Sequence, residues 1–196
     1  MPTGNSDAQS TWLRLKPDTE YAVAQLNSLL QQPDESSQNL IDAYLFAKRA
    51  LADSMQALLR TQIPRTCETF REMRSGLERT LTRLYGDRIP EQYLKVPYGS
   101  RTHEELFSIL LERQGQPVEG VLLRIITADK VHAERRTREL RELGLDIRAT
   151  RSQGADVYTL HSLDLDPEKL PSIVANLIRG DKSLTKYEQE ELQARL

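Results

Sequence analysis

The sequence predicts a mainly helical chain with one small β-wing. Three observations lead to this fold class. Helix-forming residues such as Leu, Arg, Glu, Gln and Ala are plentiful, apolar residues recur at helical spacing along most of the 196 residues, and one pair of alternating stretches encloses a glycine. We therefore expect an N-terminal helical hairpin or small bundle, then three helices followed by a β-hairpin, and finally C-terminal helices.

Breaks in this pattern divide the chain into four expected segments. Residues 1–15 begin with small polar side chains and are expected to form a disordered tail. Residues 16–97 form a helical region, residues 98–162 hold the three helices with the β-hairpin, and residues 163–196 hold the C-terminal helices. The main boundary lies in the connector GDRIPEQYLKVPYGS, which contains two prolines and two glycines.

The N-terminal region predicts three helices. The first begins at Pro17 and ends near Gln32, where QQPDESS breaks the pattern. Ser36 or Ser37 caps the second, which Pro64 ends. The third covers about residues 66–85. We expect this region to pair two copies of the chain as a homodimer or to bind a protein partner.

Composition excludes several classes of protein. The net charge is −2, so any contact with nucleic acid must come from a local basic patch. Cys67 is the only cysteine, which excludes an intramolecular disulfide and favours a cytoplasmic protein. No apolar run approaches the roughly 20 residues that cross a bilayer, and the N-terminus lacks the features of a secretory signal, so we expect no membrane contact.

Residues 102–162 carry the strongest pattern. Thr102-His-Glu-Glu105 predicts a capping box that opens a first helix, and GVLLRII predicts a short second helix. After the turn Thr127-Ala-Asp129, the run KVHAERRTRELREL predicts a third helix that Gly144 closes. Two alternating stretches, LDIRATRS and DVYTLHS, are then joined by a loop that contains Gly154, which predicts a β-hairpin.

The third helix is expected to have two unlike faces. Apolar and small residues recur at spacings of four, three and three, and should pack inward: Ala133, Thr137, Leu140 and Leu143. The opposite face is largely basic: Lys130, His132, Glu134, Arg135, Arg138 and Arg141. From Lys130 to Arg151 the chain has seven Lys or Arg and four Asp or Glu, so this stretch is basic within an acidic chain. Glu134, Glu139 and Glu142 dilute the positive charge.

The run RRTRELRELGLDIRATRSQGADVYTL resembles the recognition helix and wing of bacterial winged helix-turn-helix domains. It is close in pattern to the biotin-repressor and HTH-11-like group and to the winged helices attached to some HNH-type restriction nucleases. The resemblance covers about residues 102–162. It implies contact between double-stranded DNA and the start of the third helix, at Lys130, His132, Glu134 and Arg135.

The residue types agree with contact to DNA. Arg135 and Arg138 are expected to reach the groove or its phosphates, because the planar guanidinium makes bidentate bonds to guanine or phosphate. Arg148 and Arg151 in the wing are expected to contact the phosphate backbone of the DNA. A sequence-specific transcriptional regulator is the first expectation. The alternatives are a DNA-recognition or accessory subunit of a restriction, defence or mobile-element system, and a protein–protein adaptor whose Glu–Arg pairs merely stabilise an exposed helix.

Catalysis, metal binding and cofactor binding are not expected. The three histidines have no second ligand at metal-binding spacing, and Cys67 has no nearby histidine in the sequence. The acidic run DLDPEK superficially resembles a nuclease cluster, but Asp166-Pro167 is explained more simply as a helix start. Phosphate-cradling glycine loops are absent. We therefore expect that the chain is not an enzyme and takes no cofactor and no metal.

Overall fold

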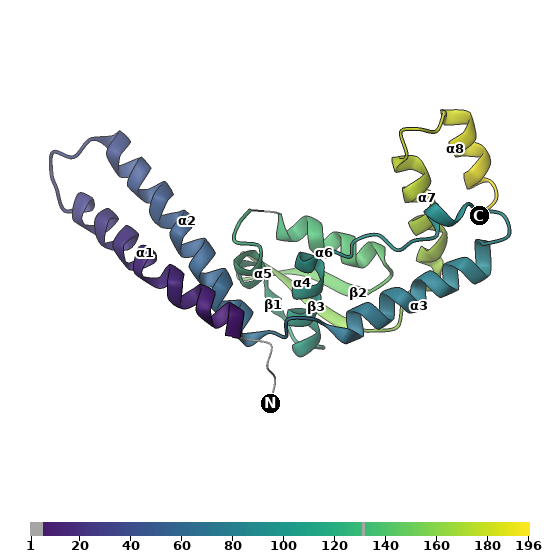
Figure 1. The fold of residues 1–196 in the computed structure, drawn as a ribbon, viewed down its shortest axis with the longest axis horizontal. Helices are drawn as coiled ribbons and strands as arrows, with labels where there is room; N and C mark the ends of the chain where they lie inside the picture. The colour runs from purple at the N-terminus through teal and green to yellow at the C-terminus, as the bar shows by residue number, and fades with distance from the viewer. Residues whose placement is uncertain (1–5, 131) are drawn as a thin grey trace. The chain divides into compact units, whose positions relative to one another are not determined.

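The computed structural model describes residues 6–130 and 132–196 of the chain. It is mainly helical with a small three-stranded antiparallel sheet, which confirms the predicted fold class (Figure 1). The elements are, in order, α1 (Ser6–Leu30), α2 (Ser37–Gln62), α3 (Glu68–Tyr85), η1 (Glu91–Tyr93), α4 (Arg101–Glu112), β1 (Val118–Glu119), α5 (Gly120–Ile126), α6 (Ala133–Glu142), β2 (Asp146–Ser152), β3 (Ala155–Ser162), η2 (Pro167–Lys169), α7 (Leu170–Gly180) and α8 (Lys186–Gln193).

The chain divides into two compact units that do not follow the predicted boundaries. The first unit contains the described residues of Met1–Arg65 and of Val121–Ala133. The second contains Thr66–Gly120 and Glu134–Leu196. Helix α3, which the sequence pattern groups with the N-terminal helices, therefore belongs to the unit that also holds α4 and the sheet.

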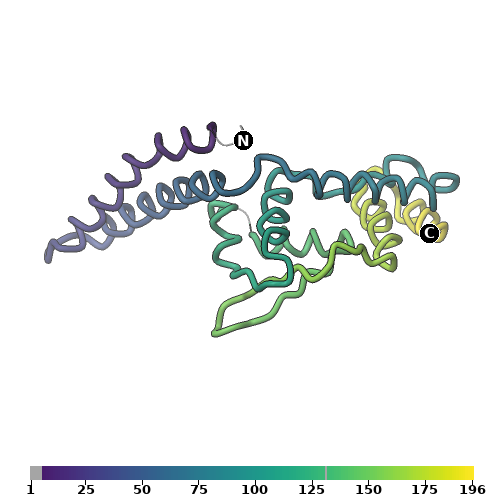
Figure 2. Tube along the Cα trace, turned by 90° about the horizontal axis from the view of Figure 1, so that it is seen from below, coloured from purple at the N-terminus to yellow at the C-terminus, as the bar shows by residue number. Residues whose placement is uncertain are grey.

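The first unit is built on an antiparallel hairpin of α1 and α2, as predicted (Figures 1 and 2). Small residues of α2 are buried along the hairpin, at Ala43, Ala47, Ser54 and Ala57. From α1, Thr19 and Ala22 are buried. The hydroxyl of Thr19 donates to the carbonyl oxygens of Leu15 at 2.9 Å and Ala50 at 3.3 Å. Side chains this small allow two helix backbones to approach closely.

Helix α5 and the turn after it complete the first unit beside the end of α2. The side-chain amide of Gln56 donates to the carbonyl oxygen of Ile126 at 2.6 Å. Ala128 and Asp129 have φ angles of 49° and 54°, in the left-handed region that stops a right-handed helix. The Lys130 ammonium lies 2.6 Å from the Asp53 carboxylate.

The second unit has a core of large apolar side chains. Phe70 of α3 and Phe107 of α4 are both buried, with their ring centroids 5.1 Å apart, within the range that favours aromatic pairing. Glu104 of α4 binds two groups of the α3 region, because its carboxylate accepts from the backbone N–H of Cys67 and from Arg71 at 2.9 Å. These contacts join α3 to α4.

The sheet confirms the predicted β-hairpin and adds a strand that the sequence pattern does not show. Strands β2 and β3 pair antiparallel through a two-residue turn at Gln153 and Gly154, whose φ angles are 50° and 83°. Two successive positive φ angles are typical of the turns whose twist suits a hairpin. The two-residue β1 pairs with β3, giving the order β1-β3-β2.

Several predicted caps and boundaries can be compared with the observed ones. The Ser36 cap, the Thr185–Glu188 capping box and the Asp166 helix start are confirmed. The predicted cap at Thr102 is wrong, since α4 begins at Arg101. The predicted disordered tail over residues 1–15 is wrong from residue 6 onward, because α1 begins at Ser6; its first five residues lie outside the described part of the chain.

None of the helices in the described part of the chain combines the length and apolar character that crossing a membrane requires.

Candidate nucleic-acid interface

Helix α6 separates a buried face from an exposed basic face, as the sequence predicts. The four residues expected to pack inward are at most 2% exposed: Ala133, Thr137, Leu140 and Leu143. Arg135, Arg138 and Arg141 are all exposed. A helix with an apolar stripe on one side anchors itself through that stripe, so the arginines are held outward by the packing of the other face.

The helix begins later than predicted, which changes the position of two expected contact residues. Lys130 and His132 precede α6 and belong to the first unit, whereas the prediction places them within the helix. Both are exposed, but Lys130 forms an ion pair with Asp53. Ala128 and Asp129 adopt left-handed conformations within the predicted turn, and α6 begins at Ala133.

The arginines of α6 differ in whether they bind other groups of the chain. Arg135 keeps 70% of its side chain exposed, yet its Nε donates to Glu139 at 3.1 Å. Among the residues that the structure describes, neither Arg138 nor Arg141 has a hydrogen-bond or ion-pair partner. Such guanidinium groups retain all their donors for an external acceptor.

The three glutamates of α6, which the sequence predicts to dilute the basic face, differ in their exposure. Glu139 is buried, with 6% of its surface exposed. Glu142 accepts a hydrogen bond of 2.6 Å from the hydroxyl of Tyr98, and burial together with this bond raises the pKa of Tyr98. Glu134 is half-buried. Of the three glutamates, Glu139 is thus removed from the exposed face, whereas Glu142 still lines the groove beside Arg138 and Arg141.

Glu139 is the centre of a buried polar network that ties α6 to α4. Its carboxylate lies 2.8 Å from Nε2 of His103 and 2.7 Å from Nη1 of Arg136. Nδ1 of His103 lies 2.7 Å from the Ser100 hydroxyl. An ionised carboxylate can only accept, so Nε2 of a neutral His103 donates to Glu139 and Nδ1 accepts from Ser100.

The ionisation of this pair follows from its surroundings. Burial is the main cause that lowers the pKa of His103, although Glu139 acts in the opposite direction. Burial by itself would raise the pKa of Glu139, but hydrogen bonds from His103 and Arg136 outweigh it and hold the pKa below its ordinary value. The network thus joins an ionised glutamate to a neutral histidine. The sequence pattern did not reveal this pair, because its partners lie 36 residues apart.

The β2–β3 hairpin presents the other two predicted arginines. From Arg148 to Ala155 every residue of the hairpin is exposed, so its tip projects beyond the buried core (Figure 2). The side chains of Arg148 and Arg151 are 66% and 78% exposed. Each faces one carboxylate: Asp146 at 3.3 Å from Arg148, and Asp156 at 3.6 Å from Arg151. Ion pairs this exposed are weak and can exchange for phosphate.

A groove of ≈1110 Å³ brings α6 and the wing together. It is lined by Arg138 and Arg141 of α6 and by Arg148 of β2. Its lining also includes acidic groups, among them Asp164 and Asp166. The arrangement favours a polyanion bound along α6 and the wing and disfavours one that enters the groove beside residues 164–166.

The acidic run after β3 has local structural roles. Asp166 accepts from the backbone N–H of Glu168 at 3.0 Å, and Asp164 accepts from the hydroxyl of Ser162 at 2.9 Å. Cys67 is buried. Among the described residues no group of His, Cys, Asp and Glu is arranged to hold a metal ion. The expectation that the chain is not an enzyme stays a prediction.

Comparisons with protein-family models, curated proteins and solved structures found no match to this chain.

Proposed function

We propose that this protein binds double-stranded DNA through α6 and the β2–β3 hairpin of the second unit, which would serve as the recognition helix and wing of a winged helix-turn-helix. The observation that carries the proposal is the division of α6. Its apolar face is buried, and Arg138 and Arg141 on the other face are exposed and have no partner within the described chain. A helix fits the major groove of DNA, where arginine binds guanine or phosphate through two parallel hydrogen bonds.

The order of the elements supports the proposal. Three helices are followed by an antiparallel hairpin, which is the order that the winged-helix resemblance implies. The wing adds Arg148 and Arg151 for the phosphate backbone, and Arg135 lies on the same exposed face of α6. The proposed contacts from the second unit are therefore Arg135, Arg138, Arg141, Arg148 and Arg151. Lys130 and His132 remain candidates from the first unit.

A transcriptional regulator in the cytoplasm is the first choice of biological role. A DNA-recognition subunit of a restriction, defence or mobile-element system would use the same surface, with the nuclease on another chain. In either role a dimer would favour a two-fold symmetric DNA site with half-sites about one helical turn, or multiples of it, apart.

A protein–protein adaptor is the second candidate, and one observation favours it. Arg135, Arg148 and Arg151 each already face a carboxylate of this chain, and the groove beside α6 carries acidic as well as basic groups. A surface of mixed charge suits a protein partner better than a uniform polyanion.

Fluorescence anisotropy with a labelled random duplex at near-physiological salt separates the two candidates. We expect wild-type protein to bind and the variant Arg138→Ala/Arg141→Ala to bind at least roughly tenfold more weakly, since each charge-assisted contact contributes about 1.5–3 kcal/mol. The matched control is Arg79→Ala/Arg83→Ala, which removes the same charge from exposed positions of α3. Equal affinities for the two variants would contradict the proposed face, and no binding by any form would favour the adaptor.

A further inference from the structure

The α1–α2 hairpin buries its small residues and exposes its large apolar ones. The row that packs inside α2 consists of Ala43, Ala47, Ser54 and Ala57. Ile41, Tyr44 and Leu51 of the same helix are 51%, 52% and 40% exposed. A helix that leaves large apolar side chains in water while burying alanines has a second surface that another element can cover.

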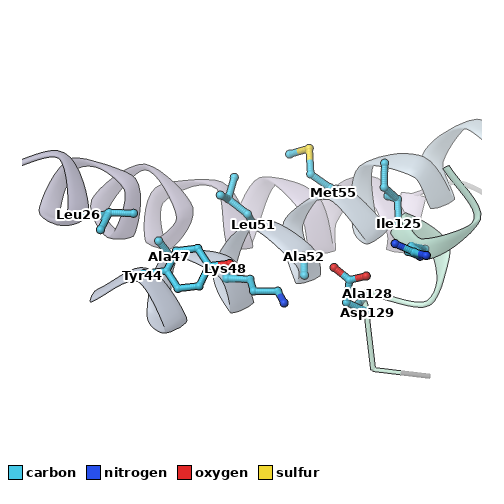
Figure 3. Close-up of a pocket in the computed structure, with 11 residues that line it drawn as sticks. Leu26, Tyr44, Ala47, Lys48, Leu51, Ala52, Met55, Ile125, Ala128 and Asp129 are labelled. Carbon is cyan, nitrogen blue, oxygen red and sulfur yellow. The ribbon is translucent and has the colours of Figure 1, made fainter. Parts of the chain in front are cut away.

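One face of α2 carries a row of mainly apolar residues. On α2, Ile41, Tyr44, Lys48, Leu51 and Met55 follow one another at spacings of three and four, the repeat of a coiled-coil interface. Tyr44, Leu51 and Met55 also line a groove of ≈320 Å³ together with Leu26 of α1 and with Ile125 beyond α2, all within the first unit (Figure 3). We call this surface the Tyr44 face.

The face continues onto α1. Val23 and Leu30 lie three residues before and four residues after Leu26, so they share its side of the helix. They are 42% and 65% exposed. Phe46 and Leu45 of α2 are exposed as well, but they lie two residues and one residue from Tyr44, around 200° and 100° away on the helix. The Tyr44 face is therefore the one on which both helices contribute apolar rows.

Charge is divided between the two ends of the hairpin. From residue 31 to residue 47, which covers the tip and the first part of α2, the sequence has no Lys or Arg and three acidic residues: Asp34, Glu35 and Asp42. From residue 48 to residue 65 it has four basic residues and one acidic residue. Among the described residues, Lys48 and Arg49 have no hydrogen-bond or ion-pair partner. The tip is thus acidic and the middle of α2 is basic.

We propose that the Tyr44 face pairs with the same face of a second copy of this chain, with the two α2 helices antiparallel. The antiparallel direction places the acidic tip of each hairpin against the basic stretch of the other, whereas a parallel pair would set like charges together. With the two-fold axis at the level of residue 46, Tyr44 of each copy lies opposite Lys48 of the other, and Ile41 lies opposite Leu51. A lysine over a tyrosine ring is itself attractive.

The size of the surface fits a stable pair. A standard interface takes roughly 20–30 residues from each partner. Helices α1 and α2 have 25 and 26 residues, and about half of them lie on one side of the hairpin. Four helices would then enclose an apolar core, as in a four-helix bundle. The pairing does not depend on the proposed DNA binding and is tested without DNA.

Sedimentation velocity of the full chain over a range of concentrations tests this pairing. We expect wild type to be dimeric and Tyr44→Glu/Leu51→Glu to be monomeric at concentrations where wild type is paired, a shift in the dimer dissociation constant of roughly a hundredfold or more. Circular dichroism checks that the variant keeps its helices, which glutamate favours. The control Phe46→Glu adds a charge at an exposed apolar position off the face and should remain dimeric. A monomeric wild type would overturn the proposal, and so would a dimer broken by Phe46→Glu but not by the pair.

A charge exchange tests the antiparallel direction. Lys48→Glu/Arg49→Glu makes the basic stretch acidic, and Glu35→Lys/Asp42→Lys makes the tip basic. Each variant alone should fail to pair with itself, and an equal mixture should form a mixed dimer. If each variant pairs with itself as well as wild type does, the antiparallel pairing is wrong.

Discussion

The α1–α2 hairpin and the core of the second unit use opposite kinds of residue for packing. In the second unit the buried side chains are large, such as Phe70, Phe107 and Leu110, and the helix exteriors are mainly polar, with Leu84 and Tyr187 as exposed exceptions. In the hairpin the buried side chains are mostly Ala, Ser and Thr, and aromatic and branched residues are exposed. Large buried side chains remove enough apolar surface from water to stabilise a unit without a partner. An alanine buries little apolar surface, although ordering its backbone costs as much conformational entropy as ordering that of a larger residue.

This difference separates two kinds of surface. The second unit buries most of its large apolar side chains and exposes the arginines of α6 and the wing, which suits it to a polyanion. The hairpin keeps its largest apolar groups outside, which suits it to an apolar partner. The predictions below test whether the two regions depend on packing in these different ways.

Replacing a buried phenylalanine of the second unit should have the largest effect. Phe107→Ala removes a ring that is 0% exposed and that packs beside Phe70, and should lower the free energy of unfolding by about 3–5 kcal/mol. The matched change in the hairpin, Phe46→Ala, concerns a side chain that is 46% exposed and should change the free energy of unfolding by less than about 0.5 kcal/mol. Urea unfolding measures the free energy of unfolding of both variants. A similar decrease for Phe107→Ala and Phe46→Ala would contradict the difference in packing between the two regions.

Enlarging a buried alanine of the hairpin should have an intermediate effect. Ala47 is 1% exposed, so Ala47→Leu forces α1 and α2 apart and should cost about 1–3 kcal/mol. Ala24→Leu adds the same atoms at an exposed position of α1 and serves as the control. If Ala47→Leu has the same free energy of unfolding as wild type, close packing of α1 against α2 does not stabilise the hairpin.

Lowering the pH should decrease the free energy of unfolding by a smaller amount, and gradually, through the His103–Glu139 pair. The pKa of His103 is lowered in the folded protein from its ordinary 6.5, so below that pH the unfolded chain binds more protons and the folded state loses stability. Glu139, whose pKa is lowered from 4.5, contributes stability that is present above pH 4.5 and lost as the pH falls through its lower folded value. Both groups therefore make the folded protein less stable as the pH falls.

Urea unfolding between pH 7.5 and pH 5 measures the histidine contribution. We expect His103→Gln to flatten the pH dependence, and His161→Gln, at an exposed position of β3, to leave it as in wild type. Identical pH profiles for wild type and His103→Gln would show that the buried histidine has no part in this loss of stability.

Local patterns in the sequence were enough to predict much of the structure of the candidate interface. The spacing of Ala133, Thr137 and Leu140 identified the buried face of α6 because one helix determines it. The glycine at 154 identified the wing because positive φ is a local requirement, and Gly144, with a φ of 97°, ends α6 as expected.

What the sequence did not reveal depends on contacts between distant segments. Strand β1 has two residues and exists only through its pairing with β3. Glu139 is buried beside His103, which lies on α4. Helix α3 packs against α4 through contacts with Phe107 and Glu104. Pro17, predicted at the start of a helix, lies inside α1 because tertiary packing overrides its local preference.

The salt dependence of duplex DNA affinity tests the central claim most directly, because it counts the phosphates that protein cations neutralise. Each phosphate contact contributes about 0.9 to the slope of log affinity against log salt. If Arg138 and Arg141 each contact phosphate, the slope of Arg138→Ala/Arg141→Ala should be smaller than that of wild type by about two, and that of Arg79→Ala/Arg83→Ala should be unchanged. If the α6 variant keeps the wild-type slope and affinity, α6 does not face DNA.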